Sequence, residues 1–462
     1  MDRLRNTEQD TYRLIVTRRH GSEVLLSGRG NSWSLPSVGI SQGQRIADQL
    51  CAKLYAQSGF RAYCLLVPTL PAAIGHCAVM ELPGDSEIGS AGTCWRPFNV
   101  ATRVGMESPD DRTVIETALA EWNQCLREPT QAPFARPGWL AELFAWVEQQ
   151  LAPLGLHLTG PFRQLNASPS FSLIYLETND SAVWFKVAGE PNRHELRVTA
   201  CITRLFPAYV PELLGVHAAW NGWLTRNVSG STLDHGAEPS SWSKAAEALA
   251  RLQILSIGNE AELLEGQCKD LRLPRLVEQI DPFIDGMREC MAAQEKHAPP
   301  PLTDPELTRL GDHLKQACSA LCDVGLPDTL GHLDVNPGNI LVPPERSVFL
   351  DWAEACVTNP LITFEYLREH LRRNCPNNTH AIDDIVVLYT RPWLSFFSPD
   401  ALRQATVVSP LVAVFAYAVG TNSWRSREAL LEPVTAAYLR SLTRRMHREA
   451  VAIVGRREPC LA

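Results

Sequence analysis

One stretch, residues 331–352, restricts what this chain can fold into more than any other part of the sequence. It begins Gly-His-Leu-Asp-Val-Asn-Pro-Gly-Asn and continues with two short apolar runs, Ile340–Val342 and Ser347–Leu350, around a polar turn. Short apolar runs on either side of a polar turn predict a β-hairpin. We therefore expect a tight hairpin here, with a polar loop leading into its first strand.

The hairpin is expected to bring side-chain oxygen atoms together. Residues opposite each other on antiparallel strands share one face, so we expect Asn339 to lie beside Asp351. An amide oxygen and a carboxylate side by side are suitable ligands for a hard divalent cation such as Mg²⁺. Asp334 lies upstream on a loop closed by Pro337 and Gly338. It is expected to supply either a third oxygen ligand or a base for an incoming hydroxyl.

The spacing of these polar residues resembles the catalytic loop of protein-kinase-like enzymes, His-x-Asp-x-x-x-x-Asn followed by a metal-binding Asp. The segments GHLDVNPGNILV and VFLDWAEA closely resemble one branch of these enzymes, the aminoglycoside phosphotransferase and choline kinase family. The alternative is a structural hairpin with incidental acidic residues. One position departs from the pattern, because Asn336 stands where relatives often have His.

The resemblance implies a role for each polar residue of this stretch. Asp334 would orient and deprotonate the acceptor hydroxyl. Asn339 and Asp351 would hold Mg²⁺, and His332 would order the catalytic loop rather than move a proton. Asn336 is not a metal-ligand position in the family, so its departure does not argue against activity.

A lysine inside an apolar strand marks the nucleotide half of the expected site. Lys186 lies within the apolar run Ala182–Val187, where a charge is costly unless it is paired or faces a ligand. The resemblance implies that Lys186 pairs with Glu195 on the following helix and contacts the nucleotide phosphates. Glu190 is the weaker partner because it precedes a proline. An ordinary edge-strand lysine is the alternative reading.

The loop expected to cover the phosphates, residues 164–171, lacks the glycines of the protein-kinase loop. Serine hydroxyls and backbone N–H groups can also hold phosphate. Ser168 and Ser170 are therefore candidate phosphate contacts, and an ordinary polar turn is an equal alternative.

The N-terminal region carries a second resemblance. Residues 31–39 read NSWSLPSVG and residues 52–60 read AKLYAQSGF, and together they resemble the Nudix box, whose glutamates bind Mg²⁺ and hydrolyse diphosphates. The family's acidic positions are occupied here by Gln44, Ala52, Lys53, Ala56 and Gln57. Because a Mg²⁺ site of this kind needs carboxylates, we expect a non-catalytic Nudix-like α/β domain over residues 1–130. An unrelated α+β domain is the alternative.

The expected fold is therefore of the α+β class. A bilobal protein-kinase-like fold, with a small β-rich lobe over 138–231 and a large helical lobe over 232–455, follows the Nudix-like domain. Prolines 129, 133 and 137 look like a linker between them. Apolar spacing predicts the following helices: Ile46–Ser58, Thr113–Arg127, Trp139–Leu151, Arg193–Phe206, Ser243–Leu255, Leu273–Gln294, Pro305–Val324, Leu361–Arg373, Ile382–Tyr389, Ala401–Val419 (broken or kinked at Pro410) and Ser426–Val454.

Composition limits the binding partners and the cellular location that we expect. A formal charge of -8 argues against non-specific binding to nucleic acid. The 13 cysteines contain no CxxC pair, which suits reduced thiols and a cytoplasmic location. No apolar leader follows Met1. The apolar stretch 407–420 is too short to span a bilayer, so we expect a buried helix and no membrane partner.

These observations predict an ATP-dependent (or other NTP-dependent) small-molecule kinase that uses Mg²⁺. The partner would be a small polar acceptor that carries a hydroxyl group, with an amino-bearing compound as one option. Glu354, Glu365 and Glu369 could meet a cationic acceptor, or could equally be solvated helix residues. A protein kinase is disfavoured, because no Ala-Pro-Glu segment follows Asp351-Trp352. A non-catalytic nucleotide-binding regulator is a further alternative. The sequence does not decide whether the chain forms a homodimer.

Overall fold

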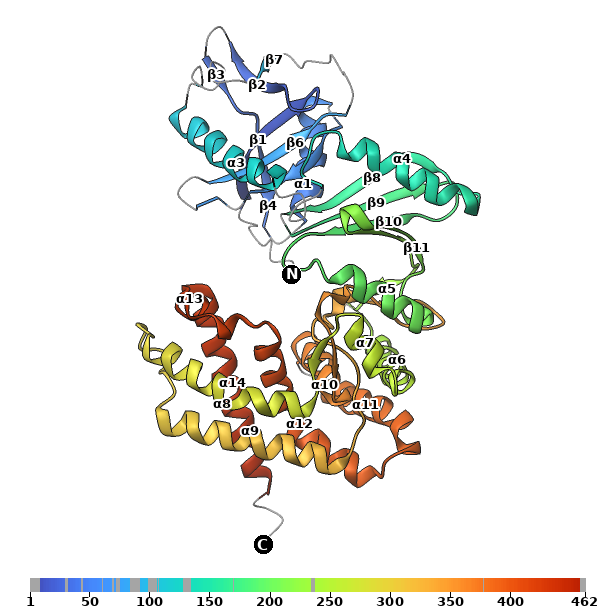
Figure 1. The fold of residues 1–462 in the computed structure, drawn as a ribbon, viewed down its shortest axis with the longest axis vertical. Helices are drawn as coiled ribbons and strands as arrows, with labels where there is room; N and C mark the ends of the chain where they lie inside the picture. Colours follow the sequence, from blue (N-terminus) through green and yellow to red (C-terminus); the bar gives the residue numbers. More distant parts are fainter. Residues whose placement is uncertain are drawn as a thin grey trace. The chain divides into compact units, whose positions relative to one another are not determined.

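The computed structural model describes residues 9–29, 32–42, 45–59, 61–68, 70–71, 75–83, 92–98, 106, 108–127, 134–168, 170–233, 237–376 and 378–457. The chain forms two compact units, which are considered one at a time (Figure 1). The first comprises Met1–Leu196 and Glu212–Asn227, and the second comprises Arg197–Pro211 and Val228–Ala462.

The N-terminal part of the first unit is built on a mixed sheet of order β3-β2-β1-β6-β5, to which β4 and β7 add at β1 and β2. Strands β1 and β2 form a hairpin, in which they pair antiparallel with Thr17 opposite Val24. In contrast, β1 and β6 run parallel. The strands are β1 (Gln9–Arg18), β2 (Glu23–Arg29), β3 (Ser32–Ser34), β4 (Ser37–Ser41), β5 (Tyr63–Leu66), β6 (His76–Glu81) and β7 (Thr93–Pro97).

Each face of this sheet is covered by one helix, because successive side chains of a strand point to opposite faces. Ile15 of β1 packs in a buried cluster with residues of α3 (Pro109–Arg127). Leu14 and Val16, its neighbours in the chain, pack with α1 (Ile46–Ser58) on the other face. The bounds of α1 are those expected from the sequence, and Gly59 ends it in the left-handed conformation.

The rest of the first unit is an antiparallel sheet of order β11-β12-β10-β9-β8. The predicted helix α4 (Trp139–Leu151) packs on it, with Trp139 in ring contact with Phe185 and Trp220. Helix α5 follows β10 in the chain; it begins in this unit with Glu195 and Leu196, and its remaining residues belong to the second unit. The bounds are β8 (Leu158–Ala167), β9 (Phe171–Thr178), β10 (Val183–Ala188), α5 (Glu195–Leu205), β11 (Leu213–His217) and β12 (Gly222–Arg226).

The two sheets of the first unit share one hydrophobic core. A single buried cluster contains Ile15 and Val114 from the N-terminal part, and Leu143 and Phe185 from the second sheet and its helix. The segment expected to be a linker contributes Phe134 and Ala135 to that cluster, at 2% and 0% exposure. Prolines 129 and 133 lie outside the described residues. Residues 134 and 135 are therefore core, and the N-terminal part packs directly on the second sheet.

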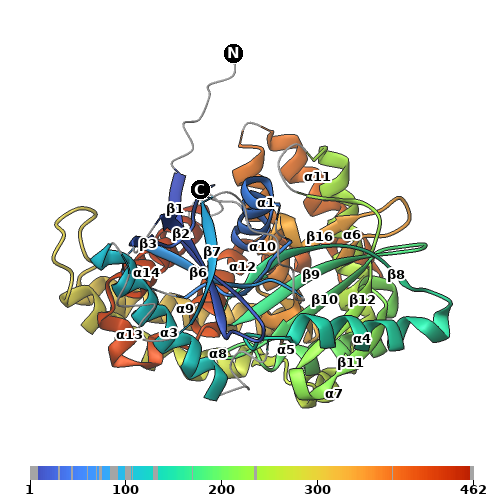
Figure 2. The same ribbon diagram turned by 90° about the horizontal axis from the view of Figure 1, so that it is seen from above.

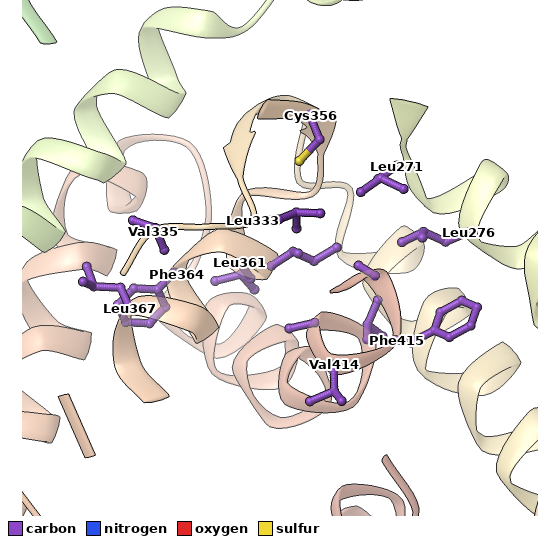
Figure 3. Packing of buried hydrophobic residues seen from close by; sticks show 14 of the residues in the cluster. Leu271, Leu276, Leu333, Val335, Cys356, Leu361, Phe364, Leu367, Val414 and Phe415 are labelled. Carbon is purple, nitrogen blue, oxygen red and sulfur yellow. The ribbon is translucent and has the colours of Figure 1, made fainter. Parts of the chain in front are cut away.

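The second unit is mostly helical and is organised around α12, which runs without a break through the buried Pro410. Figure 3 shows its Val414 and Phe415 among buried side chains of other elements. By length and composition α12 could cross a membrane, and 72% of its most apolar window is buried inside the structure. Helices α6 and α11 lie side by side (Figure 2). The helices are α6 (Pro239–Ser256), α7 (Glu260–Glu265), α8 (Leu273–Ala292), α9 (Asp304–Val324), α10 (Pro360–Asn374), α11 (Thr379–Thr390), α12 (Pro399–Gly420), α13 (Arg427–Leu431) and α14 (Pro433–Arg457).

Two differences from the expected helices have local causes. The predicted helix Ser426–Val454 is two helices, α13 and α14, that separate at Pro433. Proline has no N–H to continue a helix and is well suited to begin one, which explains the break. The expected break or kink at Pro410 is not a break, since the helix hydrogen-bonding pattern continues past it.

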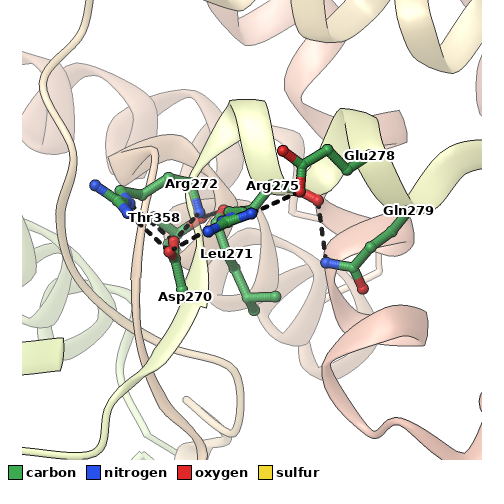
Figure 4. A network of polar contacts seen from close by, with 7 residues as sticks. All are labelled: Asp270, Leu271, Arg272, Arg275, Glu278, Gln279 and Thr358. Carbon is green, nitrogen blue, oxygen red and sulfur yellow. Dashed lines mark hydrogen bonds and ion pairs between the residues drawn. The ribbon is translucent and has the colours of Figure 1, made fainter.

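Two small sheets in the second unit position the motif of residues 331–352. The first has the order β13-β16-β17 and contains the expected hairpin, and the second has the order β14-β18-β15. Asp270 at β14 accepts hydrogen bonds from Arg272 and also pairs with Arg275, and Thr358 donates to the carbonyl of Leu271 (Figure 4). The strands are β13 (Ser231–Thr232), β14 (Lys269–Leu271), β15 (Thr329–His332), β16 (Ile340–Val342), β17 (Val348–Phe349) and β18 (Ala355–Thr358).

Candidate functional site

The polar loop of the site begins at the end of β15, where only glycine fits at position 331. A Cβ atom on Gly331 would lie 2.6 Å from Cγ2 of Thr358 and 2.8 Å from Sγ of Cys356. Such distances are shorter than real Cβ contacts, so the close approach of β15 to β18 depends on this glycine. The strand therefore delivers His332 and the loop after it from a fixed, buried position.

His332 holds the loop to the strand that precedes Asp351. Its Nδ1 accepts a hydrogen bond from the backbone N–H of Asp334 at 3.1 Å. Its Nε2 lies 2.9 Å from the carbonyl oxygen of Leu350 and must therefore carry the proton and donate it. His332 is 1% exposed, and burial lowers the pKa of its imidazole. A neutral imidazole with both nitrogens engaged agrees with the predicted ordering role.

The Asp334 carboxylate is held by two side-chain amides. Nδ2 of Asn336 donates to Oδ1 at 2.9 Å, and Nδ2 of Asn339 donates to Oδ2 at 3.1 Å. Asn336 also accepts the backbone N–H of Gly338 through its own Oδ1 at 2.9 Å. Each carboxylate oxygen keeps a further lone pair. Asp334 is exposed, so a fixed and accessible acceptor stands at the position expected for the base.

The predicted hairpin is present, but its register differs from the expected placement of Asn339. Ile340 pairs with Phe349, so the residue opposite Asn339 is Leu350, whose N–H donates to the carbonyl of Asn339 at 2.8 Å. Asp351 lies one residue beyond, with a left-handed φ of 61°. Cross-strand pairing therefore does not place Asn339 beside Asp351. Because the amide nitrogen of Asn339 faces Asp334, its oxygen points elsewhere and is available as a ligand.

The first unit contains the expected lysine–glutamate pair. Nζ of Lys186 on β10 lies 2.6 Å from Oε1 of Glu195 at the start of α5, and the Glu195 side chain is 2% exposed. The rings of Phe171 and Trp223 lie on either side in the sheet, with centroids 5.4 and 5.8 Å from Nζ. Lys186 lies on an interior strand of the sheet, so the edge-strand interpretation does not apply.

The serine loop is a tight turn between β8 and β9 with its hydroxyls already engaged. Oγ of Ser168 lies 3.0 Å from Oγ of Ser170 and accepts the N–H of Phe171 at 3.3 Å. The carbonyl of Ser170 accepts the N–H of Gly189 at 2.7 Å, which joins the turn to the end of β10. The turn is thus anchored to the Lys186 strand, while the contact of either hydroxyl with phosphate stays a prediction.

The three acidic residues considered for a cationic acceptor are all paired with cations. Glu354 contacts Nζ of Lys269, and Glu365 lies 2.6 Å from Arg368. Burial raises the pKa of Glu365, which is 4% exposed and also accepts the Ser409 hydroxyl. Glu369 lies within 3.6 Å of guanidinium nitrogens of Arg372, Arg373 and Arg445. The interpretation as a solvated helix residue is therefore wrong for the buried Glu365, whereas Glu354 and Glu369 are paired and partly exposed, with side chains 34% and 23% accessible.

Helix α1 ends at Gly59 as the resemblance to the Nudix box predicts, and none of the exposed residues of this helix is a carboxylate. Ala52, Lys53, Ala56 and Gln57 are exposed, and Gln44 lies outside the described residues. In the part of the chain that the structure describes, no group of three or more His, Cys, Asp or Glu side chains could hold a metal ion. The Nudix-like identity of this part stays a prediction.

Sequence reasoning missed two supporting asparagines. Asn221, with a φ of 55°, donates through Nδ2 to the carbonyls of Ala188 and Arg193, and so fixes the loop between the Lys186 strand and Glu195. Asn336 was noticed only as a departure from a family pattern, and its bond to Asp334 was not expected. The Pro-Gly that follows it, typical of an Asx turn, was the available signal.

One protein-family model matches part of the chain. Residues 193–367 match the model of the phosphotransferase enzyme family, a segment that contains Glu195, the loop of Asp334, and Asp351. No curated protein matches the chain. The chain thus carries the sequence pattern of a phosphotransferase over this part of its length.

Individual solved structures resemble the chain more distantly. A macrolide 2′-phosphotransferase from Brachybacterium faecium is 16% identical, with 64% of this chain and 97% of that chain covered and a TM-score of 0.43. A choline/ethanolamine kinase family protein from Mesorhizobium loti is 17% identical, with 67% and 98% covered and a TM-score of 0.41. A Plasmodium vivax ethanolamine kinase is 14% identical, with 70% and 93% covered and a TM-score of 0.44. At TM-scores below 0.5 these likenesses add nothing about the reaction.

Proposed function

We propose that this protein is an ATP-dependent, Mg²⁺-dependent phosphotransferase that moves the γ-phosphoryl group of a nucleotide to a hydroxyl of a small molecule. The observation that carries the proposal is the Asp334 carboxylate, which is exposed and held by the amides of Asn336 and Asn339. A fixed carboxylate with free lone pairs can accept a hydroxyl proton while the oxygen attacks phosphorus. Its location within the family-matched segment supports the same reaction.

The donor set of the second unit suits a hard divalent cation. Asp351 offers an exposed carboxylate, and the amide oxygen of Asn339 is left available because the nitrogen binds Asp334. Oxygen donors of this kind are those Mg²⁺ prefers. Such an ion would neutralise charge on the nucleotide phosphates. In this proposal Asn339 has two tasks, since one amide both orients the base and supplies a ligand.

Lys186, on strand β10 of the first unit, would bind the nucleotide phosphates. Its ion pair with Glu195 and the flanking rings keep the ammonium group in one place. Ammonium at a fixed position attracts phosphate oxygens with little loss of side-chain entropy on binding. Ser168 and Ser170 would add hydroxyl or backbone contacts at the turn that is bonded to Gly189.

The N-terminal part is proposed to support the phosphate loop rather than to hydrolyse diphosphates. The amide of Gln164 on β8 bonds both the N–H and the C=O of Cys64 on β5, at 2.7 and 2.8 Å. The N–H of Val67 donates to Ala167 at 3.0 Å, one residue before Ser168. The N-terminal part therefore holds the strand that leads into the turn. A cytoplasmic location is proposed with this reading, since an intracellular nucleotide is the phosphate donor.

The proposal is tested by separating the base from the metal site. We expect Asp334→Asn to lower phosphoryl transfer by about 10²–10⁴-fold while Mg-ATP still binds, because only the proton acceptor is lost. Asp351→Ala should instead abolish Mg²⁺-dependent ATP binding, because it removes the anionic ligand. Asp323→Asn, an exposed position at the end of α9, is the matched control and should behave as wild type.

Calorimetric titration with Mg-ATP and a mass-shift screen of hydroxylated metabolites provide the two measurements. Near-native turnover of Asp334→Asn on any acceptor found would disprove the proposed mechanism. Normal Mg-ATP binding without any phosphorylated product in the wild type would favour a nucleotide-binding regulator instead.

A further inference from the structure

A cavity of about 430 Å³ lies in the second unit, at the closed end of the β16–β17 hairpin. Its walls are the hairpin turn, residues 343–347, helix α6, and the 3₁₀ helix Pro207–Tyr209, which contacts β17. Asn339 and Asp351 lie at the other end of that hairpin. The volume falls in the range of small-molecule sites, roughly 300–1,000 Å³. We call this space the cationic cavity.

Four cationic side chains meet two carboxylates in the cationic cavity. Nη2 of Arg251 and Nη2 of Arg391 each donate to Oε1 of Glu247 at 2.8 Å. Glu247 is therefore fully occupied by its own two arginines. Two positive charges remain in excess, which is close to the charge of a phosphate monoester at neutral pH, about -1.5 to -2. Arg391 joins the charged residues of the lining through Glu247, and those residues are Lys244, Glu247, Arg251, Glu345 and Arg346.

Lys244 and Arg346 are the cations left for a ligand. Both are exposed, and neither forms an ion pair within the part of the chain that the structure describes. The guanidinium carbon of Arg346 lies 5.0 Å from the ring centroid of Tyr209, which is 4% exposed. A buried ring thus supports the guanidinium group and leaves its N–H groups available. Guanidinium binds phosphate in a paired geometry, and an ammonium group adds a point charge.

Ser347, the next residue in the chain, adds a hydroxyl group to the lining. It is 2% exposed, and its Oγ has no hydrogen-bond partner among the residues that the structure describes. A buried hydroxyl without a partner is unusual and costs free energy. An oxyanion bound to Arg346 could accept the proton of this hydroxyl. Adjacent residues of the turn therefore offer two kinds of donor to one anion.

A second hollow, of about 500 Å³, adjoins the cationic cavity and shares Tyr209 and Arg251 with it. Leu255 and Phe396 line this hollow and are 57% and 56% exposed. Covering such side chains with an apolar group is favourable. We call this space the apolar hollow. Its apolar lining residues are Ile254, Leu255, Pro392 and Phe396.

We propose that the two spaces form one binding site for a small phosphate monoester with an apolar body. Lys244, Arg346 and the Ser347 hydroxyl bind the phosphate group, and the apolar body packs on Leu255 and Phe396. The excess positive charge selects the anion, and the adjoining hollow selects an ester over the free phosphate ion. The site does not depend on the proposed phosphotransferase function, because the described lining contains no residue assigned to that reaction.

Four probes separate the charge from the apolar body: phenyl phosphate, benzyl alcohol, glucose 6-phosphate and inorganic phosphate. Each is titrated calorimetrically into the full-length protein in the presence of Mg²⁺ and a non-hydrolysable ATP analogue. We expect phenyl phosphate to bind about tenfold more tightly than each other probe, because only this probe has both features. Higher ionic strength should weaken its binding, since the charged contacts are exposed.

Charge variants locate the phosphate group. Lys244→Gln and Arg346→Gln should each weaken phenyl phosphate binding by about tenfold, as expected for one charge-assisted contact. Neither should change the affinity for benzyl alcohol. Lys296→Gln and Arg309→Gln are the matched controls, because both side chains are exposed and line neither space. These controls should bind phenyl phosphate as the wild type does.

One apolar variant locates the body of the ester. Phe396→Ala should weaken phenyl phosphate binding by about threefold to tenfold, because part of the apolar contact is lost. It should leave the affinity for inorganic phosphate unchanged. Leu394→Ala is the control, since Leu394 lies two residues away, is 48% exposed and does not line the hollow.

Three results would overturn the assignment. No binding of phenyl phosphate, or binding that is unchanged in both Lys244→Gln and Arg346→Gln, would refute the phosphate site. Inorganic phosphate or glucose 6-phosphate binding as tightly as phenyl phosphate would refute the apolar selection. Benzyl alcohol binding as tightly would refute the role of charge. Phosphoryl transfer is decided separately, by Asp334→Asn, so failure of one proposal leaves the other standing.

Discussion

Asn336 shows how much depends on a single side chain in this loop. It donates to Oδ1 of Asp334 and accepts the N–H of Gly338, so it connects the orientation of the proposed base to the shape of the turn. The two bonds come from opposite ends of one amide. Substitutions can therefore separate the two contributions.

We expect Asn336→Asp to lower the turnover number more than Asn336→Ala does. The aspartate keeps an acceptor for Gly338 but sets a second carboxylate at hydrogen-bond distance from Asp334, where like charges repel. Alanine loses both bonds without adding repulsion, and its effect should be about tenfold. Steady-state kinetics of both variants, with KM for Mg-ATP as the readout that should not move, checks the order. If Asn336 served the turn alone, the aspartate variant would be the more active one.

At the residue scale, sequence reasoning selected the candidate site residues and missed the side chains that hold them in place. Asp334, His332 and Lys186 could be selected because each is a polar residue in a recognisable spacing or an apolar setting. The lysine–glutamate pair is present as predicted. The placement of Asn339 beside Asp351 was wrong in its register, because Ile340–Val342 and the facing run 348–350 are apolar throughout and have no alternation that would fix the pairing.

At the scale of elements, β8 connects the N-terminal sheet to the proposed phosphate loop. Gln164 in this strand is 2% exposed and bonds both the N–H and the C=O of Cys64. Its neighbour Arg163 reaches Asp48 of α1 through an exposed ion pair of 2.8 Å. The strand therefore has a buried contact and an exposed contact to the N-terminal part, side by side in the chain.

Loss of the buried Gln164 contact should lower stability and weaken ATP use, whereas loss of the exposed Arg163 ion pair should have little effect on either. We expect Gln164→Leu to lower the free energy of unfolding by about 1–3 kcal/mol, because the N–H and C=O of Cys64 lose their partners. It should also raise KM for ATP, since β8 leads directly to Ser168. Arg163→Leu should change stability by less than about 1 kcal/mol. Thermal unfolding and ATP kinetics of the two variants make the comparison, and equal effects would refute the proposed support of the loop.

Long amphipathic elements were predictable, while short ones were not. Helices α1 and α4 have the predicted bounds, because apolar spacing and a following glycine or turn define them locally. Strands β13 and β14 contain only two and three residues and carry no readable period. They exist because β16 and β18 offer free edges, which is a property of the folded unit.

At the scale of the whole molecule, the shared core of the first unit could not be read from the sequence, because it joins residues far apart in the chain. Ile15, Val114, Phe134 and Phe185 belong to one buried cluster. The prolines between the two sheets suggested separation, whereas the residues directly after them are core. Sequence reasoning gave the order of the parts, and packing determined which of them form one unit.

This packing predicts that the N-terminal part cannot be removed cleanly. A variant lacking residues 1–130 would expose the apolar face of α4 and the second sheet, so we expect aggregation or loss of cooperative unfolding. Size-exclusion chromatography and thermal unfolding test it, with full-length protein as control. The full-length Asp334→Asn variant, assayed with Mg²⁺ and Mn²⁺ on dinucleoside polyphosphates, should show no hydrolysis. A monodisperse, fully active truncation, or metal-dependent hydrolysis, would contradict a supporting role.

The common cluster of the first unit also limits how such a gene can change by recombination. A domain with its own core can be gained, lost or exchanged as an intact cassette. Here a crossover between the segments encoding the two sheets would divide a single set of interlocking side chains. New partners for the second sheet would have to arrive with a matching apolar face, so the two parts of the first unit are expected to be inherited and to diverge together.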